Sequence, residues 1–349
     1  MGRSRTAWSR ASDMLMLVGF CLVSDLALAA DQSLIDAAKR EGRVTWYTTL
    51  VIDQFVRPLS EAFEGKYGIK VEYVRSTSNE VILRITNEAK AGRIMADVID
   101  GNAYAGALRR ENLLLDWLPE ATRKMPPQYF DRQGYWVATN LFVLTPGFNT
   151  DLVPKGTEPR TFEDLLNPRW KGQIAWGTIP VAASAPGFIG NVLEHMGEEK
   201  GMDYLRKLAG QDIVNVGIAA GRPLVDMLIT GERAIALQIF HHHTVISAQK
   251  GAPVDWIPMQ PAFANLSITS VVRSAPHPDA GKLLIDFILS REGQEILQRA
   301  NYTPIDPDVP LLDQRLRPND QTLQVRWFSP EDTERGMPKW MQILKDLFR

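Results

Sequence analysis

Three consecutive histidines, His241 to His243, are the residues of this sequence with the clearest capacity for chemistry. They follow a short apolar run, 234–239, which predicts a buried strand. Ligands of open α/β sheets bind at the carboxyl ends of strands, so the histidines fall where a site is expected. Because side chains alternate along a strand, the first and third imidazoles would share one face. An exposed polar loop is the alternative interpretation of the same residues.

Small polar residues follow other predicted strands in the same way. Strands are predicted over 43–47, 69–74 and 96–99, and each leads into a polar turn and then a helix. Helix amino ends carry unpaired N–H groups that favour anions, so several such corners at one sheet edge indicate a ligand cleft. Ordinary helix capping is the alternative role of each hydroxyl. The candidates are Thr48, Thr49, Ser76, Thr77, Ser78 and Asn102 in the first half of the chain, and Ser184 and Arg222 in the second.

The elements that must position these residues form two similar series of strands and helices. Thr77 and Glu80 have the spacing of a capping box, which predicts a helix start at that corner. The β-rich segments 134–149 and 265–272 separate the two series and are interpreted as crossovers. The sequence therefore predicts an α/β fold of two lobes with two hinge crossovers. Residues 31–140 and 266–349 are assigned to lobe 1, and residues 141–265 to lobe 2.

Length and composition limit the possible functions. A chain of 349 residues exceeds one compact core, and its 45% hydrophobic and 23% charged residues are typical of a globular protein. The formal net charge of -2 argues against a nucleic-acid or anionic-membrane surface.

Residues 1–30 have the pattern of a secretory signal peptide. Arginines precede the apolar run Met14 to Val23, and Ala27 to Ala30 form a small-residue cleavage site. The single cysteine, Cys21, lies within this segment, so no disulfide, thiol nucleophile or thiolate metal site is expected in the mature chain. We expect a periplasmic protein that is monomeric and has no cofactor.

Several motifs resemble one family, the extracellular solute-binding proteins of bacterial ABC importers, with the type 2 periplasmic-binding fold, in the branch that includes ferric-iron-binding proteins. The resemblance implies two lobes that close on a small-molecule solute by hinge bending and then dock on an ABC permease in the inner membrane. It implies a binding protein rather than an enzyme. The motifs include 41–48 (EGRVTWYT), 63–71 (FEGKYGIKV), 148–154 (FNTDLVP), 162–172 (FEDLLNPRWKG), 275–278 (APHP) and 287–294 (FILSREGQ).

The resemblance also gives the histidines an aligned position. Ferric-binding members carry two adjacent tyrosines after the equivalent strand, and here His241 and His242 occupy those positions. Neutral imidazoles favour zinc, copper, nickel or ferrous iron over the ferric ion that phenolates prefer. The histidine or carboxylate that iron binders contribute from the first lobe is missing at 47–51 and at 101–102.

Three hypotheses follow for the function. The first is a binding protein for a small organic or oxyanionic solute, recognised by the hydroxyl donors, the helix amino ends, Arg222 and a protonated histidine. The second is a metal or ferric-chelate binder that uses His241 and His242, with His243 as a further ligand. The third, a secreted hydrolase, lacks the G-x-S-x-G and H-E-x-x-H motifs. The two remaining histidines fall outside the site, with His195 expected to face solvent and His277 to have a structural role.

Overall fold

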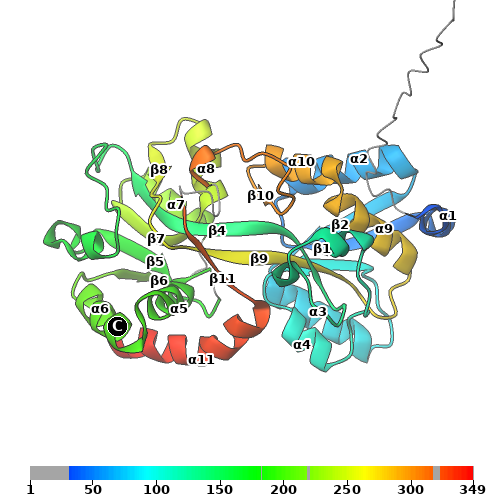
Figure 1. Cartoon of the computed structure of the whole chain (residues 1–349), viewed down its shortest axis with the longest axis horizontal. Coiled ribbons are helices and arrows are strands. Elements are labelled where there is room, and N and C mark those ends of the chain that lie inside the picture. Colours follow the sequence, from blue (N-terminus) through cyan, green and yellow to red (C-terminus); the bar gives the residue numbers. More distant parts are fainter. Residues whose placement is uncertain (1–30, 182, 218–220, 317–322, 349) are drawn as a thin grey trace, which may run out of the picture.

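The computed structural model describes residues 31–181, 183–217, 221–316 and 323–348, and its elements form two lobes on one continuous sheet (Figure 1). The predicted signal peptide, 1–30, lies outside the described residues. Within those residues, no helix is long and apolar enough to cross a membrane. The strands follow the order β2-β1-β3-β9-β4-β7-β5-β6, with β10 and β8 also paired to β4 and β11 paired to β9.

The first lobe is built by the chain up to β4 and completed by segments that return after β9. Its βαβ unit is present as predicted, with β1 and β2 parallel. The elements are α1 (Gln32–Glu41), β1 (Arg43–Thr48), η1 (Ile52–Val56), α2 (Arg57–Tyr67), β2 (Lys70–Arg75), α3 (Ser78–Lys90), β3 (Val98–Gly101), α4 (Ala105–Arg110), η2 (Glu120–Lys124), η3 (Pro127–Tyr129), α9 (Pro278–Leu289), α10 (Arg291–Arg299) and β10 (Thr303–Pro304).

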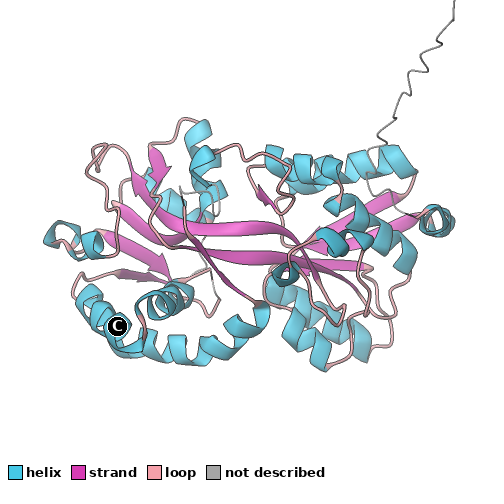
Figure 2. Ribbon diagram, viewed as in Figure 1, coloured by secondary structure: helices cyan, strands magenta, loops and turns pink. Residues whose placement is uncertain are grey.

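The second lobe is built by the part of the chain between β4 and β9, and it repeats the alternation of strands and helices (Figure 2). Its elements are η4 (Glu163–Leu166), η5 (Pro168–Trp170), β5 (Ile174–Gly177), α5 (Ala185–Met196), α6 (Glu198–Ala209), β6 (Val214–Val216), α7 (Arg222–Ile229), β7 (Ile235–Phe240), α8 (His241–Gln249) and β8 (Val254–Trp256). The chain ends with η6 (Gln314–Leu316), β11 (Val325–Phe328) and α11 (Pro330–Leu347).

Strands β4 (Val137–Asn149) and β9 (Ala262–Val271) are the two crossovers, and they pair with each other along most of their length. The carboxyl-terminal half of β9 continues into the first lobe, where it pairs antiparallel with β3. The second half of β4 pairs antiparallel with β7 in the other lobe. In these registers β3 and β7 run toward each other, so their carboxyl ends point at the middle of the crossovers from opposite sides, β3 at the level of Ala138 and β7 at the level of Leu144. The topology therefore places the predicted sites of both lobes at one location.

Local sequence signals explain how several of these elements begin and end. Helix α2 starts at Arg57 with Pro58 in its first turn, where a missing N–H costs nothing, and it stops at Gly68 in the left-handed conformation. The predicted capping box is confirmed: Glu80 N–H donates to Thr77 Oγ1 at 3.3 Å, and Thr77 N–H donates to Glu80 Oε2 at 2.7 Å. Helix α3 consequently starts at the corner that the sequence predicted.

The C-terminal helix packs on the second lobe. Trp340 of α11 belongs to the same hydrophobic cluster as Trp176 of β5 and Phe188 of α5. The sequence analysis assigned 266–349 to lobe 1, but the apolar face of α11 is buried against α5 instead. The first turns of α11 reach back to α4, where Glu334 pairs with Arg110, so the helix runs along the lower edge in Figure 1 from one lobe toward the other.

Candidate functional site

The three histidines begin a helix rather than end a strand. The predicted strand is present as β7, but the chain turns at Phe240, and His241 is the first residue of α8. Strand alternation therefore does not apply to the histidines, and the pairing of the first and third imidazoles on one face was wrong.

His241 and His242 lie on opposite sides of the crossover strand β4. The ring of His242 packs 5.7 Å from the ring of Phe142. The ring of His241 lies 4.8 Å from that of Trp256, which belongs to the hydrophobic cluster of Val143. Consecutive strand residues such as Phe142 and Val143 point to opposite faces, so the two imidazoles are directed apart.

His241 is held by an ion-pair network on the outer side of that strand. Its Nε2 lies 3.4 Å from Asp313 Oδ2, which also accepts from Trp256 Nε1 at 2.8 Å. Arg315 donates to Asp313 at 2.9 Å and to both carboxylate oxygens of Asp255 at 3.1 Å. These donors hold the pKa of Asp313 far below its ordinary value, although burial opposes them. His241 therefore anchors α8 to the C-terminal segment.

The structure does not bring His241 and His242 to a common point where they could share an ion. Among the described parts of the chain, no group of three or more His, Cys, Asp or Glu side chains is arranged to hold a metal. His242 is instead surrounded by aromatic rings: Tyr302 at 4.6 Å, Phe240 at 5.5 Å and the imidazole of His243 at 4.4 Å.

The imidazoles are uncharged at neutral pH. Burial lowers the pKa of His241 and lowers that of His242 further, with their neighbouring imidazoles adding to the effect on His242. Burial also lowers the pKa of His243 to about 4, and the positive charges of Arg75 and Arg222 contribute to this shift. His243 Nδ1 is buried and has no hydrogen-bond partner within the described chain. The charges of Arg75 and Arg222, one from each lobe, therefore help to keep the His243 imidazole neutral, and its Nδ1 makes no hydrogen bond within the described chain.

In the first lobe, Asp100 organises the corner that follows β1. Its buried carboxylate accepts hydrogen bonds from Trp46 Nε1, from Thr49 N and from Thr49 Oγ1, each at 2.7 Å, and from the Thr48 hydroxyl. The sequence analysis treated Thr48 and Thr49 as hydroxyl donors toward a solute. A donor role is excluded for both, because their hydroxyl protons are already donated to Asp100, while contact of Thr49 with a solute stays a prediction.

The other predicted first-lobe residues are divided between capping and the same corner. Thr77 caps α3 and donates its hydroxyl proton to Glu80 at 3.0 Å. Ser78 Oγ donates to Asn102 Oδ1 at 3.2 Å, which joins the start of α3 to the turn after β3. Ser76 is tied through its backbone, whose N–H donates to the Thr48 carbonyl at 2.9 Å. Ser78 and Asn102 therefore border the site, whereas Thr77 has a structural role.

The second-lobe candidates retain more of their hydrogen-bonding capacity. Ser184 precedes α5 but does not cap it, which corrects the predicted capping role; its Oγ is buried without a partner among the described residues. Arg222, the first residue of α7, donates to Asp226 at 2.7 Å and to Ser247 Oγ at 3.1 Å. These contacts fix the guanidinium between α7 and α8, beside His243.

Residues of the crossover strands β4 and β9 form the floor of the site between the lobes. Phe142 and Asn265 face each other across the β4–β9 ladder and so share one face of the sheet. That face also carries Tyr302, whose ring lies 5.7 Å from Phe142. Tyr302 OH accepts from Val51 N–H at 3.2 Å, and Asp100 and Arg75 both affect its pKa, which burial raises. Asn265 Nδ2 is buried without a partner in the described chain.

Arg75, Asp100 and Tyr302 were not predicted as binding residues, and His243 was predicted only as a further metal ligand, although all four belong to this region. Arg75 directly precedes Ser76, His243 directly follows His242 and Asp100 lies two residues before Asn102, so a search that included the near neighbours of the predicted residues would have found them. Tyr302 follows α10, far along the chain, and carries no local signal of its position.

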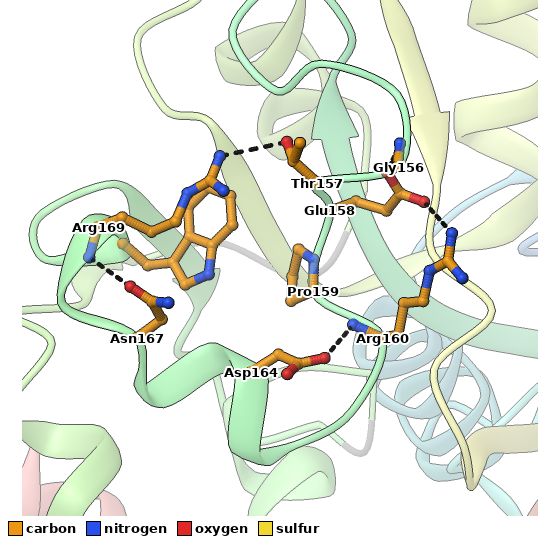
Figure 3. Close-up of a pocket in the computed structure, with 9 residues that line it drawn as sticks. Gly156, Thr157, Glu158, Pro159, Arg160, Asp164, Asn167 and Arg169 are labelled. Carbon is orange, nitrogen blue, oxygen red and sulfur yellow. Dashed lines mark hydrogen bonds and ion pairs between the residues drawn. The ribbon is translucent and has the colours of Figure 1, made fainter.

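A separate surface pocket of about 350 Å³ lies in the loop between β4 and β5 (Figure 3). The loop precedes β5, so the pocket lies at the amino end of that strand, whereas the histidines follow the carboxyl end of β7. Its arginines are already engaged: Arg160 pairs with Glu158 and Arg169 donates to Thr157. The pocket is not part of the site between the lobes.

The two remaining histidines lie outside the site, as predicted. His195 is exposed on α5. His277 precedes α9, and its ring and backbone N–H both bond the buried carboxylate of Asp97, at 3.0 Å and 2.6 Å. His277 therefore ties α9 to the first-lobe sheet.

The fold and this arrangement define a two-lobed binding protein, and sequence comparison agrees. The chain belongs to the bacterial extracellular solute-binding protein family, whose model matches residues 94–328. It is a periplasmic solute-binding component of ABC import, and the family consists of binding proteins rather than enzymes.

Two curated relatives have different ligands in their names. A "Fe(3+)-binding periplasmic protein" of Serratia marcescens is 26% identical over 274 residues, covering 71% of this chain and 74% of the relative. A "Putative 2-aminoethylphosphonate-binding periplasmic protein" of Salmonella paratyphi A is 24% identical over 318 residues, covering 88% and 86%.

Solved structures share the fold. Iron-bound HitA from Pseudomonas aeruginosa superimposes with a TM-score of 0.68 at 20% identity, over 87% of this chain and 99% of that one. AfuA from Actinobacillus pleuropneumoniae, with fructose-6-phosphate bound, gives a TM-score of 0.67 at 22% identity over 87% and 99%. The predicted family and the two-lobed fold are thus confirmed, while these identities leave the ligand open.

Proposed function

We propose that this protein captures a small organic oxyanion, of the phosphate or phosphonate type, between its lobes and delivers it to an ABC permease. The observation that carries the proposal is a pair of guanidinium groups, Arg75 from one lobe and Arg222 from the other, whose charges act on His243. Arg222 is linked to His243 through Ser247, which accepts from the guanidinium at 3.1 Å and donates to the His243 carbonyl at 2.8 Å. We further propose that residues 1–30 direct export to the periplasm, and that the protein works as a monomer.

The charges of the site favour an anion. Arg75 forms no ion pair with a carboxylate in the described chain, and Arg222 has only one such partner, Asp226. Guanidinium groups bind phosphate and phosphonate oxygens through paired, charge-assisted hydrogen bonds. His243 is neutral and close to both arginines, so it can donate a hydrogen bond without adding a charge that would have to be desolvated.

The second lobe adds neutral donors to these charges. Ser184 Oγ is buried, has no partner in the described chain, and precedes the amino end of α5. The unpaired N–H groups and the positive end of the helix dipole favour an anion at that place. The proposed binding set is thus Arg75, Arg222, His243 and Ser184, with His242 and Tyr302 forming an aromatic wall.

The relatives support both this proposal and its alternative. One has 2-aminoethylphosphonate in its name and another has Fe(3+), so the family includes both kinds of ligand. The separated imidazoles of His241 and His242 favour the oxyanion. A ferric chelate remains the competing ligand, and the experiment must distinguish the two.

Thermal melting with defined ligands tests the proposal. Purified mature protein is melted with 2-aminoethylphosphonate, inorganic phosphate or ferric citrate, and affinities are measured by calorimetry. We expect the phosphonate to raise Tm and to bind. A Tm that responds to ferric citrate but to neither phosphorus oxyanion would overturn the proposal in favour of iron.

The variant Arg75→Ala locates the site. Loss of a charged hydrogen bond costs about 1.5–3 kcal/mol, so affinity should fall by about tenfold or more. Arg93→Ala is the matched control, because Arg93 is exposed beyond the opposite end of α3. Equal affinities in both variants would remove Arg75 from the site.

A further inference from the structure

We infer that Asp100 makes the first-lobe wall of the site a hydrogen-bond acceptor, so that the protein selects solutes that carry a donor group, a hydroxyl or an ammonium, opposite their anionic end. The inference rests on the proposed function, because it concerns the second end of an anionic solute. In this assignment Asp100 is a positioning residue, and Thr49 is the residue that touches the solute.

The hydrogen bonds around Asp100 fix the direction of each hydroxyl. The carboxylate is 1% exposed and accepts from Trp46 Nε1, from the Thr49 backbone and from the hydroxyls of Thr48 and Thr49. Four donors on two oxygens satisfy an ionised carboxylate, whereas a protonated acid would present its own proton to one of them. Burial raises the pKa of the Asp100 carboxyl, but the hydrogen bonds from Thr48, Thr49 and Trp46 oppose that shift, and their four donors match the ionised form.

A hydroxyl group has one proton and two acceptor lone pairs. Thr49 donates its proton to Asp100 Oδ1 at 2.7 Å, so its oxygen can offer only lone pairs to a ligand. Thr48 is fully buried and its oxygen already accepts from Leu50 N–H at 3.1 Å. Thr49 is partly exposed, and it is the hydroxyl that remains available to accept.

The backbone of Gly101 packs closely against the side chains of Thr49 and Ser78 and so brings them together. A Cβ at Gly101 would lie 2.7 Å from Ser78 Oγ and 3.5 Å from Thr49 Cγ2, so the three residues meet where Gly101 has no side chain. Ser78 donates its proton to Asn102 Oδ1, and its oxygen accepts from Asn102 N–H at 3.5 Å, which leaves one lone pair on that oxygen to accept from a ligand. Thr49 and Ser78 together form a wall of acceptors backed by a buried negative charge.

The opposite lobe has the opposite character. Arg222 and the neutral His243 are donors there, as is the Ser184 hydroxyl, which has no partner among the described residues, and the positive charge of Arg75, at the end of β2, also acts on His243. Tyr302 lies between the two regions, since its OH accepts from Val51 N–H at 3.2 Å and its ring lies 4.6 Å from that of His242. A solute bound with its oxyanion at the arginines would therefore place its other end at Thr49. A donor group there gains a hydrogen bond, whereas an alkyl group leaves the oxygens of Thr49 and Ser78 without a partner.

Three phosphonates that differ in one group test this inference. Ethylphosphonate, 2-hydroxyethylphosphonate and 2-aminoethylphosphonate share the anion, and the last two add a donor. We expect wild-type protein to bind at least one donor-bearing member about tenfold more tightly than ethylphosphonate. The tighter of the two tells whether a hydroxyl or an ammonium is preferred.

Two substitutions at Thr49 assign the preference to this wall. Thr49→Val keeps the shape of the side chain and the backbone N–H bond to Asp100 but removes the hydroxyl acceptor. The affinity for a donor-bearing phosphonate divided by the affinity for ethylphosphonate should then fall to about one. Thr49→Ser restores the hydroxyl and should restore the ratio. Asp100→Asn frees the threonine protons to point outward and should also reduce the ratio; its Tm is measured to show that it folds.

The outcomes separate the two proposals. Equal binding of all three phosphonates by wild-type protein would overturn the inference and leave the oxyanion function standing. A preference that survives unchanged in Thr49→Val would also overturn it. Failure of every phosphonate to bind, with ferric citrate binding instead, would overturn the proposed function and the inference together.

Discussion

The buried state of His243 predicts a specific loss of stability in mild acid. Its pKa is about 4 in the folded protein against an ordinary value of 6.5, because burial and two nearby arginines disfavour the charged ring. As pH falls below 6.5 the unfolded chain takes up this proton and the folded chain does not, so the free energy of unfolding decreases until pH 4 is reached. The two pKa values correspond to a loss of about 3 kcal/mol from this group.

Urea denaturation of wild type and His243→Gln at several pH values between 7.5 and 4 measures this contribution. His241 and His242 have lowered pKa values as well and remain in both proteins, so the informative quantity is the difference between the two curves. Above pH 6.5 that difference should be constant, and by pH 4 it should have shifted by about 3 kcal/mol in favour of the variant.

His195→Gln is the control: burial and Arg326 lower the pKa of His195 too, but the residue is exposed, so its substitution should alter the curve far less than that of the buried His243. Parallel curves for wild type and His243→Gln over the whole range would refute the reasoning. They would mean that the folded protein protonates His243 as easily as the unfolded chain does, and that the ring is not held neutral beside the arginines.

Two further substitutions test the packing and the ion network around the site. Gly190→Ala should destabilise the protein by about 1–3 kcal/mol in urea denaturation, because its Cβ would lie 2.5 Å from ring atoms of Trp340, whereas Gly65→Ala, with nothing within 4 Å, should be neutral or stabilising. Asp313→Ala should lower the free energy of unfolding by about 2–3 kcal/mol, because Trp256, Arg315 and His241 lose their shared acceptor. Asp308→Ala, on the exposed neighbouring loop, is the control and should lower it much less. Similar melting of the two variants would show that the network does not stabilise the protein.

Much of the fold could be predicted from the sequence, because its signals are local. Pro58 and Gly68 determine the ends of α2, and the pattern Thr77 to Glu80 fixed the start of α3. Helix α9 follows the same logic, since its amphipathic pattern begins at a proline, Pro278. The packing of α11 could not be predicted. Its apolar residues face α5 of the other lobe, and the partner of a helix cannot be determined from periodicity.

The site was predicted in location but not in chemistry. The polar residues after each strand do gather where β3 and β7 meet. What the sequence could not supply was the direction of each proton. Thr49 has the residue type of a donor, and only the position of Asp100 makes it an acceptor. His241 likewise has the residue type of a ligand, and only Asp313, 72 positions later, gives it a structural partner.

The two shared crossover strands also determine how this protein can fold. Thr139 Oγ1 in β4 donates to the Ser267 carbonyl in β9, 128 positions later in the chain. Neither lobe has a complete sheet until this distant pairing has formed, so neither half can reach its native structure first as an independent unit. Such non-local pairing slows folding, because a long loop must close before its contacts stabilise the chain. Under the export that we propose for residues 1–30, slow closure favours a chain that is still unfolded when it crosses the membrane.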